Sequence, residues 1–459
     1  MKRTDIAEDN ALVNRRQKNI VVKRTVITDD ASLAAVKRDI LARSSRDASP
    51  ELAAKVESVR KIVEAVRLEG DAAVARFTEQ FDGVALSPER FELTRAEMDA
   101  AAERVEPAVL RALERALENI HAFHARNLRE SWRETYPDGT VLGQNVAPIE
   151  SAGVYVPGGK AFYPSSVLMN IVPAHVAGVQ EIVMVSPPSL NGDIHPGVIA
   201  AARMAGATRV FRVGGAQAVA ALAYGTERIP AVCKITGPGN TYVTAAKALV
   251  RGAVEIDSEA GPSEVVVLAD DGADPRFAAY EMLAQAEHDE EAMSVLITPS
   301  AKLADAVSAC LAEQAPMLER AGIIAKSLAG QGAAIVTRSL EEAVALTNLI
   351  APEHLSIQTR DAAKVAEAIV NAGAVMIGAM TPVAVGDYFA GPNHILPTMR
   401  RARFSSPLTA EDFRKVTSIL EYSAARLREQ GDDIIRLATL EGLQAHARSV
   451  AVRVEENFQ

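Results

Sequence analysis

Val154-Tyr155-Val156-Pro157-Gly158-Gly159 opens the stretch that decides the fold, because it is the first of four short apolar runs that each end in a turn. The other runs are Ile182-Val183-Met184-Val185, Val210-Phe211-Arg212-Val213 and Val232-Cys233-Lys234-Ile235. Segments rich in small residues, such as 197–205 and 216–224, separate these runs and have the composition of helices. Strands that alternate with helices in this way predict an open parallel sheet with helices on its faces.

A second series of apolar runs follows near 264–269, 294–297, 333–337 and 374–377, again with predicted helices between them. We therefore predict an α/β protein with two similar Rossmann-like open parallel-sheet domains, an N-terminal arm and a helical C-terminal segment. The predicted boundaries are 1–48 for the N-terminal arm, 49–152 with 264–404 for a discontinuous first α/β domain, 153–263 for the second α/β domain, and 405–459 for the C-terminal segment. Helices are predicted from Pro50 to Gly70 and over about 95–129, followed by a turn-rich link at Trp132 and Tyr136.

The composition excludes several classes of protein. The 459 residues are 48% hydrophobic and 24% charged, which is normal for a globular protein with a large core. The formal net charge is −10 and no long basic block occurs, so a nucleic-acid surface is not expected. No run of 18 or more uninterrupted apolar residues occurs and the N-terminus is charged, so we predict neither a membrane span nor a signal peptide.

The two cysteines, Cys233 and Cys310, lie far apart in apolar runs. We predict that both are buried thiols in a reducing compartment, and that neither forms a disulfide or a thiolate metal site. These features together predict a cytoplasmic protein.

Three glycine-rich turns, at 157–159, 214–215 and 237–240, each follow a predicted strand. Ligands of such sheets bind at the carboxyl ends of the strands, and glycine lets the backbone approach a phosphate closely. Any single turn is more simply explained as a tight connection, and Gly237-Pro238-Gly239 lacks the third glycine of the dinucleotide-binding fingerprint. Three of them in one domain favour a nucleotide or another phosphate-containing ligand.

The stretch Gln285-Ala286-Glu287-His288-Asp289 ends a helix that is predicted to begin at Asp274-Pro275, a favourable N-cap and first helical residue. The buried side of this helix is expected to consist of Phe277, Met282 and Leu283. Gln285 and His288 are three residues apart, so they share a face of the helix and could supply half of a divalent-metal site. Taken alone, the pair is more simply explained as the polar end of a surface helix.

Other stretches place polar residues where chemistry is plausible. Glu353 and His354 follow a proline, so a turn could point both into one cleft, where histidine acts as a general acid or base and glutamate activates a water. Asp387 lies among glycines in a predicted irregular loop, a position more typical of function than of packing. Glu441 and His446 lie five residues apart on the last predicted helix, and therefore not on one face.

Four scattered residues would make a mixed nitrogen and oxygen set that suits zinc rather than calcium or an iron–sulfur cluster: Gln285, His288, Asp387 and His446. Their spacings alone do not specify such a site. His121 and His124 also lie three residues apart. We interpret them as helix-surface or core residues, with a metal site as the less favoured alternative.

At five places the sequence resembles the histidinol dehydrogenase family. The motifs, in chain order, are Gly237-Pro238-Gly239-Asn240-Thr241-Tyr242-Val243, Ala260-Gly261-Pro262-Ser263-Glu264, Gln285-Ala286-Glu287-His288, Ala351-Pro352-Glu353-His354-Leu355, and Gly391-Pro392-Asn393-His394 with Leu396-Pro397-Thr398. The resemblance extends from about residue 50 to the C-terminus and does not cover the first 48 residues. Five ordered motifs at family-like separations make it specific.

The resemblance implies an NAD-dependent enzyme that oxidises L-histidinol to L-histidine through the aldehyde in two hydride transfers, the last step of histidine biosynthesis. It implies one zinc ion per subunit, bound by Gln285, His288, Asp387 and His446. It assigns His354 as the general base and Glu353 as the group that activates the water of the second step. The implied substrate contacts are Ser263, Gln285, His288, Glu353, His354, Asp387, His394, Glu441 and His446. The residues implied to hold NAD are Tyr155, Gln217 and Asn240.

The family resemblance also implies a homodimer in which the C-terminal segment crosses to the partner. That exchange would place Glu441, His446 and His394 in the site of the neighbouring subunit. It would also explain why a helical C-terminus leaves the sheet domains.

The sequence departs from the family pattern in two places. Ser258-Glu259 stands where two apolar residues are usual, and Arg400-Arg401 stands where a glycine and a small residue are common. Surface variation explains both most simply, although arginines beside the site could favour an anionic alcohol. One alternative is therefore a relative that oxidises a sulfonated diol, against which the presence of Ser263-Glu264 and Asp387-Tyr388 argues. Another is a non-catalytic nucleotide- or metal-binding scaffold, against which the Glu353-His354 pair argues.

Overall fold

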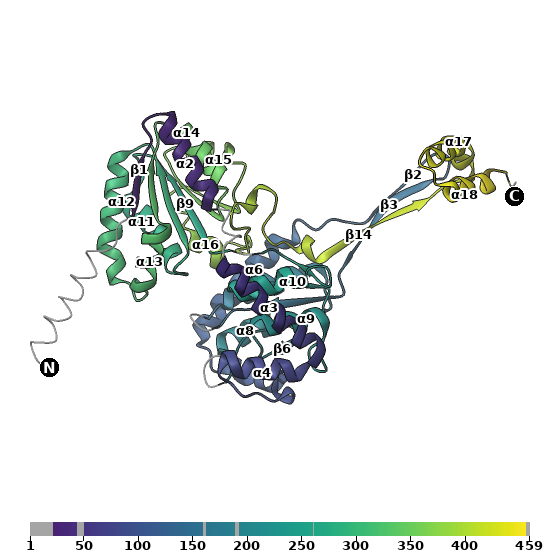
Figure 1. Cartoon of the computed structure of the whole chain (residues 1–459), viewed down its shortest axis with the longest axis horizontal. Helices are drawn as coiled ribbons and strands as arrows, with labels where there is room; N and C mark the ends of the chain where they lie inside the picture. Colours follow the sequence, from purple (N-terminus) through teal and green to yellow (C-terminus); the bar gives the residue numbers. More distant parts are fainter. Residues whose placement is uncertain (1–21, 44–49, 159–161, 189–191, 260, 456–459) are drawn as a thin grey trace, which may run out of the picture.

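The computed structural model describes residues 22–43, 50–158, 162–188, 192–259 and 261–455. Two helix-covered parallel sheets form the body of the molecule, and a narrow arm projects from it (Figure 1). The turn residue Gly159, the motif residue Ala260 and residues 1–21 and 44–48 of the predicted N-terminal arm lie outside the described ranges.

The first sheet has six parallel strands in the order β1-β11-β10-β9-β12-β13. Its strands are β1 (Lys23–Val26), β9 (Glu264–Ala269), β10 (Met293–Thr298), β11 (Ala333–Val336), β12 (His354–Gln358) and β13 (Ala374–Ile377). The helices of this part are α2 (Asp30–Arg43), α11 (Pro275–Ala286), α12 (Ala301–Gln314), α13 (Ala321–Gln331), α14 (Leu340–Ile350), α15 (Ala362–Glu367) and α16 (Val383–Tyr388). Alternate residues of β9 enter two different hydrophobic clusters, so both faces of the sheet are covered.

The second sheet has five parallel strands in the order β6-β5-β4-β7-β8. Its strands are β4 (Ser151–Tyr155), β5 (Glu181–Val185), β6 (Arg209–Phe211), β7 (Lys234–Thr236) and β8 (Glu255–Ile256). The helices around it are α3 (Pro50–Glu69), α4 (Asp71–Asp82), α5 (Arg95–Glu103), α6 (Pro107–Ala125), α7 (Pro164–Ala177), α8 (Pro196–Ala205), α9 (Gly215–Tyr224) and α10 (Thr241–Val250). Two open parallel sheets with helices confirm the predicted Rossmann-like α/β class.

The helices before β4 pack on the five-stranded sheet, which differs from the predicted grouping of residues 49–152 with 264–404. Val59 and Val63 of α3 share a buried cluster with Val183 and Ile235 of the five-stranded sheet. Ile120 of α6 belongs to the cluster on the other face of the same sheet. The apolar stripes of these helices were visible in the sequence. Which sheet each stripe covers is determined by contacts between segments that are distant in sequence.

The N-terminal segment is also part of a sheet rather than a separate arm. β1 pairs in parallel with β11 from Lys23 to Val26, and α2 packs against α14. The edge position explains why a strand of only four residues, with mostly exposed side chains, is stable there.

The projecting arm is built from segments far apart in sequence. Its three antiparallel strands are β2 (Trp132–Thr135), β3 (Val141–Pro148) and β14 (Arg414–Glu421), with β3 in the middle. The arm ends in α17 (Ala424–Leu440) and α18 (Gln444–Glu455), which pack on each other (Figure 1). The predicted turn-rich link at Trp132 and Tyr136 is thus a β-hairpin, and the segment after 405 includes a strand before its helices.

Several local predictions can now be judged. The predicted helix over 95–129 is broken at Glu106-Pro107, because proline begins a new helix there. Met282 and Leu283 are buried as expected, but Phe277 is 42% exposed. Cys233 is exposed and Cys310 half-buried, so the prediction of two buried thiols was wrong, and both thiols are free. Within the described residues, no helix combines the length and the apolar character that crossing a membrane requires.

Candidate active site

The residues predicted to hold NAD lie at the carboxyl edge of the five-stranded sheet. Tyr155 is the last residue of β4, and its hydroxyl oxygen accepts the backbone N–H of Gly215 at 3.1 Å, at the start of α9. Burial raises the pKa of Tyr155 to about 12, with the charge of Asp82 adding to the effect. The phenol therefore stays neutral and serves as a fixed hydrogen-bonding group beside the glycine turn.

Gln217 lies one turn into α9 and is fully buried, yet neither its Oε1 nor its Nε2 has a hydrogen-bond partner among the described residues. A buried amide without partners costs free energy, so such a group is expected where a ligand completes its hydrogen bonds. Gly215 has a φ of +65°, and a Cβ there would lie against the Gln217 amide. The turn therefore needs glycine to leave space for this side chain.

Asn240 occupies the N-cap of α10 and accepts the backbone N–H groups of Tyr242 and Val243 at 3.0 and 3.1 Å. Gly237, three residues before Asn240, has a φ of +116°, and a Cβ there would collide with the carbonyl oxygen of Tyr155. The backbone of this turn thus approaches the end of β4 closely. Tyr155, Gln217 and Asn240 all lie on segments that leave this carboxyl edge, where ligands of open parallel sheets usually bind.

The Glu353–His354 pair lies on the six-stranded sheet, at the edge formed by the amino ends of its parallel strands. His354 begins β12, which pairs with β9, so the pair faces the first residues of β9. Ala351, which ends α14, has a φ of +50° and turns the chain sharply into this position. The predicted proton-transfer pair therefore lies at the edge opposite to the one where ligands of parallel sheets usually bind.

Both members of the pair are buried and tightly held. Glu353 is 7% exposed, and its Oε2 accepts the backbone N–H of Glu264 at 2.7 Å. His354 is 5% exposed, and its Nδ1 lies 3.1 Å from the carbonyl oxygen of Glu264. A carbonyl oxygen only accepts, so Nδ1 must carry the hydrogen.

The other nitrogen of His354 faces Asp387. Its Nε2 lies 3.3 Å from Oδ1 of Asp387, which belongs to α16. Burial tends to lower the pKa of His354, but the charge of Glu353 and the contact with Asp387 raise it well above its usual value. Burial tends to raise the pKa of Asp387, but the hydrogen bond and charge of His354, with the charges of His394 and His288, lower it.

The predicted metal ligands of one chain come from two neighbouring helices. Gln285 is 3% exposed, and its Nε2 has no partner among the described residues, whereas His288 just beyond the helix is exposed. Glu281 lies one turn before Gln285 on α11 and accepts the backbone N–H of Val383 at 3.0 Å. That bond fixes the start of α16, the helix that carries Asp387, next to α11.

A cavity of about 380 Å³ opens beside His288, between the two sheet-containing parts of the molecule. It is lined by residues of α6, of the segment that leads into α7, of the end of α11 and of α16. Tyr163 and Phe162 face it from the five-stranded side, and Tyr388 from the six-stranded side. A ligand in this space would touch the proposed metal ligand and both parts of the chain.

His394 and Ser263 are two of the predicted substrate contacts. The Nδ1 of His394 lies 2.9 Å from the carbonyl oxygen of Asp387, and its Nε2 lies 3.4 Å from the hydroxyl of Ser166 on α7. His394 therefore joins the site of its own chain, which differs from its predicted place in the neighbouring subunit. Ser263 is half-buried directly before β9 and next to Glu264.

Glu441 and His446 are not brought to this site within one chain. Both are exposed on the arm, Glu441 at the end of α17 and His446 on α18 (Figure 1). Among the residues that the structure describes, no group of three histidine, cysteine, aspartate or glutamate side chains is placed to hold a metal ion. One chain thus places Gln285, His288 and Asp387 on or just beyond the neighbouring helices α11 and α16, and it places the fourth predicted ligand, His446, on the arm.

Two buried carboxylates that contact the site were not singled out from the sequence. Glu264 binds the segment of Glu353 and His354, and Glu281 fixes the helix of Asp387. A signal was present for Glu264, because a charged residue directly before a run of four apolar residues rarely points into a core without a partner. Glu281 gave no comparable signal among its helical neighbours.

Comparisons with known proteins agree on one family. A protein-family model described as histidinol dehydrogenase matches residues 45–454. The chain is 49% identical over 435 residues to a histidinol dehydrogenase of Halalkalibacterium halodurans, which covers 95% of this chain and 100% of the relative. It is 50% identical over 396 residues to the histidinol dehydrogenase of a Synechococcus species, which covers 86% of this chain and 91% of the relative.

A crystal structure of histidinol dehydrogenase from Elizabethkingia anophelis is also similar, with a TM-score of 0.87 and 32% sequence identity. The match covers 95% of this chain and 98% of that structure. Residues 49–459 number only 411, so the 435 aligned residues of the Halalkalibacterium relative extend the resemblance into the first 48 residues. The expectation that those residues lie outside the family was therefore wrong in part.

Proposed function

This chain belongs to the histidinol dehydrogenase family of oxidoreductases, and we propose that it oxidises L-histidinol to L-histidine through L-histidinaldehyde. Two molecules of NAD⁺ would accept the two hydrides, and one zinc ion per subunit would hold the substrate. The observation that carries this proposal is the arrangement around His354, whose two ring nitrogens face the carbonyl of Glu264 and the carboxylate of Asp387.

The first oxidation needs a base for the hydroxyl proton. Because Nδ1 of His354 donates to a carbonyl, the nitrogen that would accept a proton is Nε2, which faces the proposed metal ligand Asp387. A zinc ion bound to Asp387 would offset the negative charge that raises the pKa of His354, and Nε2 would then be free to act as the base. In this step the hydroxyl proton passes to Nε2, the carbon-bound hydrogen leaves as hydride to NAD⁺, and the alcohol becomes the aldehyde. The bond to the Glu264 carbonyl supports the role of His354 because it holds the ring in one orientation.

The second oxidation needs a water molecule. Glu353 would accept a proton from the water as its oxygen adds to the aldehyde carbon, and the hydrate would then lose a hydride to the second NAD⁺ and a proton to give the carboxylate. The Oε2 of Glu353 lies 3.5 Å from Nδ1 of His354, so the two groups belong to one site. Burial of both side chains limits the access of bulk water to the aldehyde.

The residues fit a zinc site that is completed by a second chain. Gln285, His288 and Asp387 supply one amide oxygen, one imidazole nitrogen and one carboxylate oxygen, and His446 of the partner subunit would add a nitrogen. The ligand atom of Gln285 would be Oε1, because the amide nitrogen only donates hydrogen bonds, and the Nε2 has no partner among the described residues. When bound, zinc supplies a positive centre that orients the nitrogen atoms of the substrate.

The exposed arm supports a homodimer with exchanged C-terminal segments. The arm exposes large apolar side chains, among them Leu420, Leu437 and Leu440, at 71%, 63% and 83%. Such exposure is unusual on an isolated monomer and typical of a surface that another chain covers. We propose that Glu441 and His446 of each arm complete the site of the other subunit.

The site of NAD is proposed at the carboxyl edge of the five-stranded sheet, where Tyr155, Gln217 and Asn240 gather. The unpartnered amide of Gln217 supports this placement, as does the glycine turn that begins α9. Backbone N–H groups at the start of a helix favour an anionic ligand such as a pyrophosphate.

Neither arginine of the unusual Arg400-Arg401 pair supports an anionic substrate. The guanidinium of Arg401 is bonded to the carbonyl oxygen and the carboxylate of Glu259, and Nε of Arg400 donates to the carbonyl oxygen of Leu349 at 3.0 Å. The two departures from the family pattern thus contact each other. The charge of Arg401 is balanced within the protein by Glu259, so this pair gives no support to a sulfonated diol as the substrate.

The decisive experiment is NAD⁺ reduction with L-histidinol as the limiting substrate. We expect two NADH per histidinol, loss of activity on treatment with a chelator, and recovery on addition of zinc. Oxidation of a sulfonated diol without oxidation of histidinol would contradict the proposed substrate. Zinc binding without turnover of any alcohol would contradict the proposed activity as a whole.

A further inference from the structure

Glu264 and Glu353 hold each other by reciprocal hydrogen bonds. The backbone N–H of Glu264 donates to Oε2 of Glu353 at 2.7 Å, and the backbone N–H of Glu353 donates to Oε2 of Glu264 at 3.3 Å. These residues stand at the amino ends of β9 and β12, where the parallel ladder between the strands begins. Each carboxyl group therefore satisfies a backbone donor that the ladder leaves unpaired.

We propose that Glu264 is a positioning residue of the dehydrogenase reaction, which fixes Glu353 and His354 in place without touching the substrate itself. The proposal rests on the function proposed above, because it assigns Glu353 and His354 to proton transfer. Its physical basis is that Glu264 contacts both residues through different groups, Glu353 through its carboxyl and backbone N–H and His354 through its carbonyl. A displacement of Glu264 would therefore move both Glu353 and His354.

A third contact ties the same carboxyl to another loop of the site. Oε1 of Glu264 accepts the backbone N–H of Met399 at 2.9 Å, and the neighbouring Thr398 hydroxyl accepts the backbone N–H of Gly261 at 2.6 Å. The segment 261–264, which includes Ser263, is thus clamped between the strand ends and the segment 398–401. The clamp joins three family motifs that are far apart in sequence.

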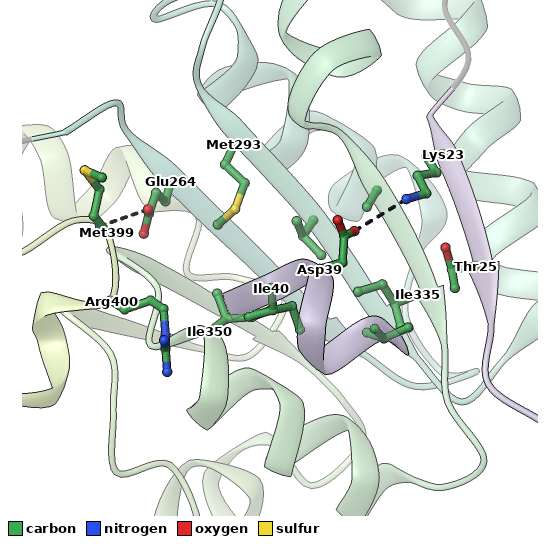
Figure 2. A pocket seen from close by; sticks show the side chains of 13 residues that line it. Lys23, Thr25, Asp39, Ile40, Glu264, Met293, Ile335, Ile350, Met399 and Arg400 are labelled. Carbon is green, nitrogen blue, oxygen red and sulfur yellow. Dashed lines mark hydrogen bonds and ion pairs between the residues drawn. The ribbon is translucent and has the colours of Figure 1, made fainter. Parts of the chain in front are cut away.

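The surroundings of Glu264 explain why the carboxyl must bond to the backbone. Glu264 lines a small cavity of about 60 Å³, together with residues of α2, Met293 and Met399. Figure 2 shows Glu264 beside Met399 and Met293 on one side of this cavity and the Lys23–Asp39 ion pair on the other. Glu264 is 8% exposed and forms no ion pair with a lysine or arginine among the described residues. Its polar partners there are backbone groups.

A buried carboxyl beside another carboxyl is costly unless it carries a proton. Burial, reinforced by the charge of Glu353, raises the pKa of Glu264 to about 8. At neutral pH Glu264 is therefore mostly neutral, which avoids a second negative charge next to Glu353. A neutral carboxyl group is better suited to positioning its neighbours than to accepting a proton from a substrate.

The test compares Glu264→Ala and Glu264→Gln with the parent enzyme. Loss of the carboxyl in Glu264→Ala should lower kcat by about 30- to 100-fold, because a displacement of about 1 Å in a catalytic group has an effect of that size. The KM values for histidinol and NAD⁺ and the zinc content should stay within about threefold, since Glu264 contacts neither ligand in the proposed site. Glu264→Gln keeps the size, the neutral charge and one acceptor, so it should restore most of kcat.

Glu342→Ala is the matched control. Glu342 also accepts a backbone N–H, from Arg338 at 2.9 Å, but it lies beyond the carboxyl end of β11, at the opposite edge of the same sheet. The kcat of the Glu342→Ala enzyme should equal that of the parent. A crystal structure of each variant gives a readout that does not depend on turnover, and Glu353 should be displaced in Glu264→Ala alone.

Two results would overturn the proposal. One is a Glu264→Ala enzyme with kcat within threefold of the parent and Glu353 in place. The other is a loss of kcat in proportion to lost zinc and lost folded protein, which would make Glu264 a residue of the fold only. If the parent itself fails to oxidise histidinol, the proposed function fails, while the position of Glu353 in the variant structures still decides the positioning role.

Discussion

Nε2 of His354 lies 3.3 Å from Oδ1 of Asp387, so the proposed base and a proposed metal ligand are in direct contact. The two residues come from different elements, the start of β12 and the end of α16. In the proposed mechanism, proton transfer and substrate placement would therefore occur at the same point of the site. Substitutions of the two residues should nevertheless have different effects, because only one of them is expected to bind the metal.

Replacement of His354 by asparagine should abolish proton transfer and leave the metal in place. We expect kcat to fall by about 10²- to 10⁴-fold, the usual contribution of a general base. Zinc content, measured by atomic emission on the purified protein, should match that of the parent. A variant with an unchanged rate would remove His354 as the base, and a variant without zinc would place it among the ligands.

Complementation between two inactive variants should reveal whether the arm is exchanged. His288→Ala removes a proposed ligand just beyond α11, and His446→Ala removes a proposed ligand from the arm, so each homodimer should bind little zinc. If each site combines His288 of one chain with His446 of the other, a mixed dimer contains one intact site and one doubly altered site. Unfolding and refolding an equal mixture should then restore about a quarter of the parental activity.

Two outcomes would contradict the exchange of the arm or the role of His446. No recovery on mixing, with mixed dimers confirmed by mass, would mean that both histidines serve the same chain. Full zinc occupancy in His446→Ala alone would remove His446 as a ligand. The parent, unfolded and refolded in the same way, is the control for the yield of the procedure.

The sequence predicted the parts of the site that depend on local spacing. Asp274-Pro275 begins α11 as predicted, and Gln285 lies in the last turn of that helix. His288 lies just beyond the helix and is exposed whereas Gln285 is buried, so the predicted shared helical face was not found. Eight of the eleven strands of the two parallel sheets were also predicted, since buried parallel strands are continuous apolar runs, whereas β1, β8 and β12 were missed. These features need only a few neighbouring residues to be recognised.

Contacts between distant segments could not be predicted in the same way. Glu264 and Glu353 are 89 residues apart, and only the pairing of β9 with β12 brings them together. The sequence placed His354 in a turn, because Pro352 lies just before it. In the structure His354 begins β12, an interior strand of the six-stranded sheet. The arm was missed for a related reason, since β14 pairs with β3 across more than 250 residues of sequence and gains its stability from that pairing.

The NAD site predicts a trade-off between stability and binding at Gln217. Gln217→Met keeps the size of the side chain and removes an amide that has no partner among the described residues. The unliganded protein should gain about 1 kcal/mol of stability, while the KM for NAD⁺ should rise about three- to tenfold. Thermal unfolding and steady-state kinetics measure the two effects.

A control for this substitution is available at Gln358, at the carboxyl end of β12. It is also buried, and its Oε1 has no partner among the described residues. Gln358→Met should alter stability without changing the KM for NAD⁺. An unchanged KM in Gln217→Met as well would place the cofactor elsewhere.

The raised pKa of Glu264 predicts a specific dependence of stability on pH. The pKa is about 8 in the folded protein, against a value of 4.5 for the free side chain, so between these values the folded state binds more protons than the unfolded state. The contribution of Glu264 to stability is therefore complete below pH 4.5 and is lost as the pH rises toward 8, by up to about 1.4 kcal/mol per pH unit. Glu264→Gln lacks the titrating group, so it should gain stability relative to the parent as the pH rises from 5 to 8.

Denaturant unfolding of the metal-free proteins is the appropriate measurement, because metal binding has a pH dependence of its own. Glu342→Gln is the control, since the hydrogen bonds from Arg338 lower the pKa of Glu342 and its contribution changes only below pH 4.5. The difference in unfolding free energy between Glu342→Gln and the parent should thus stay constant from pH 5 to 8. A constant difference for Glu264→Gln as well would mean that Glu264 ionises normally, and that the paired carboxyl groups carry two charges instead of one.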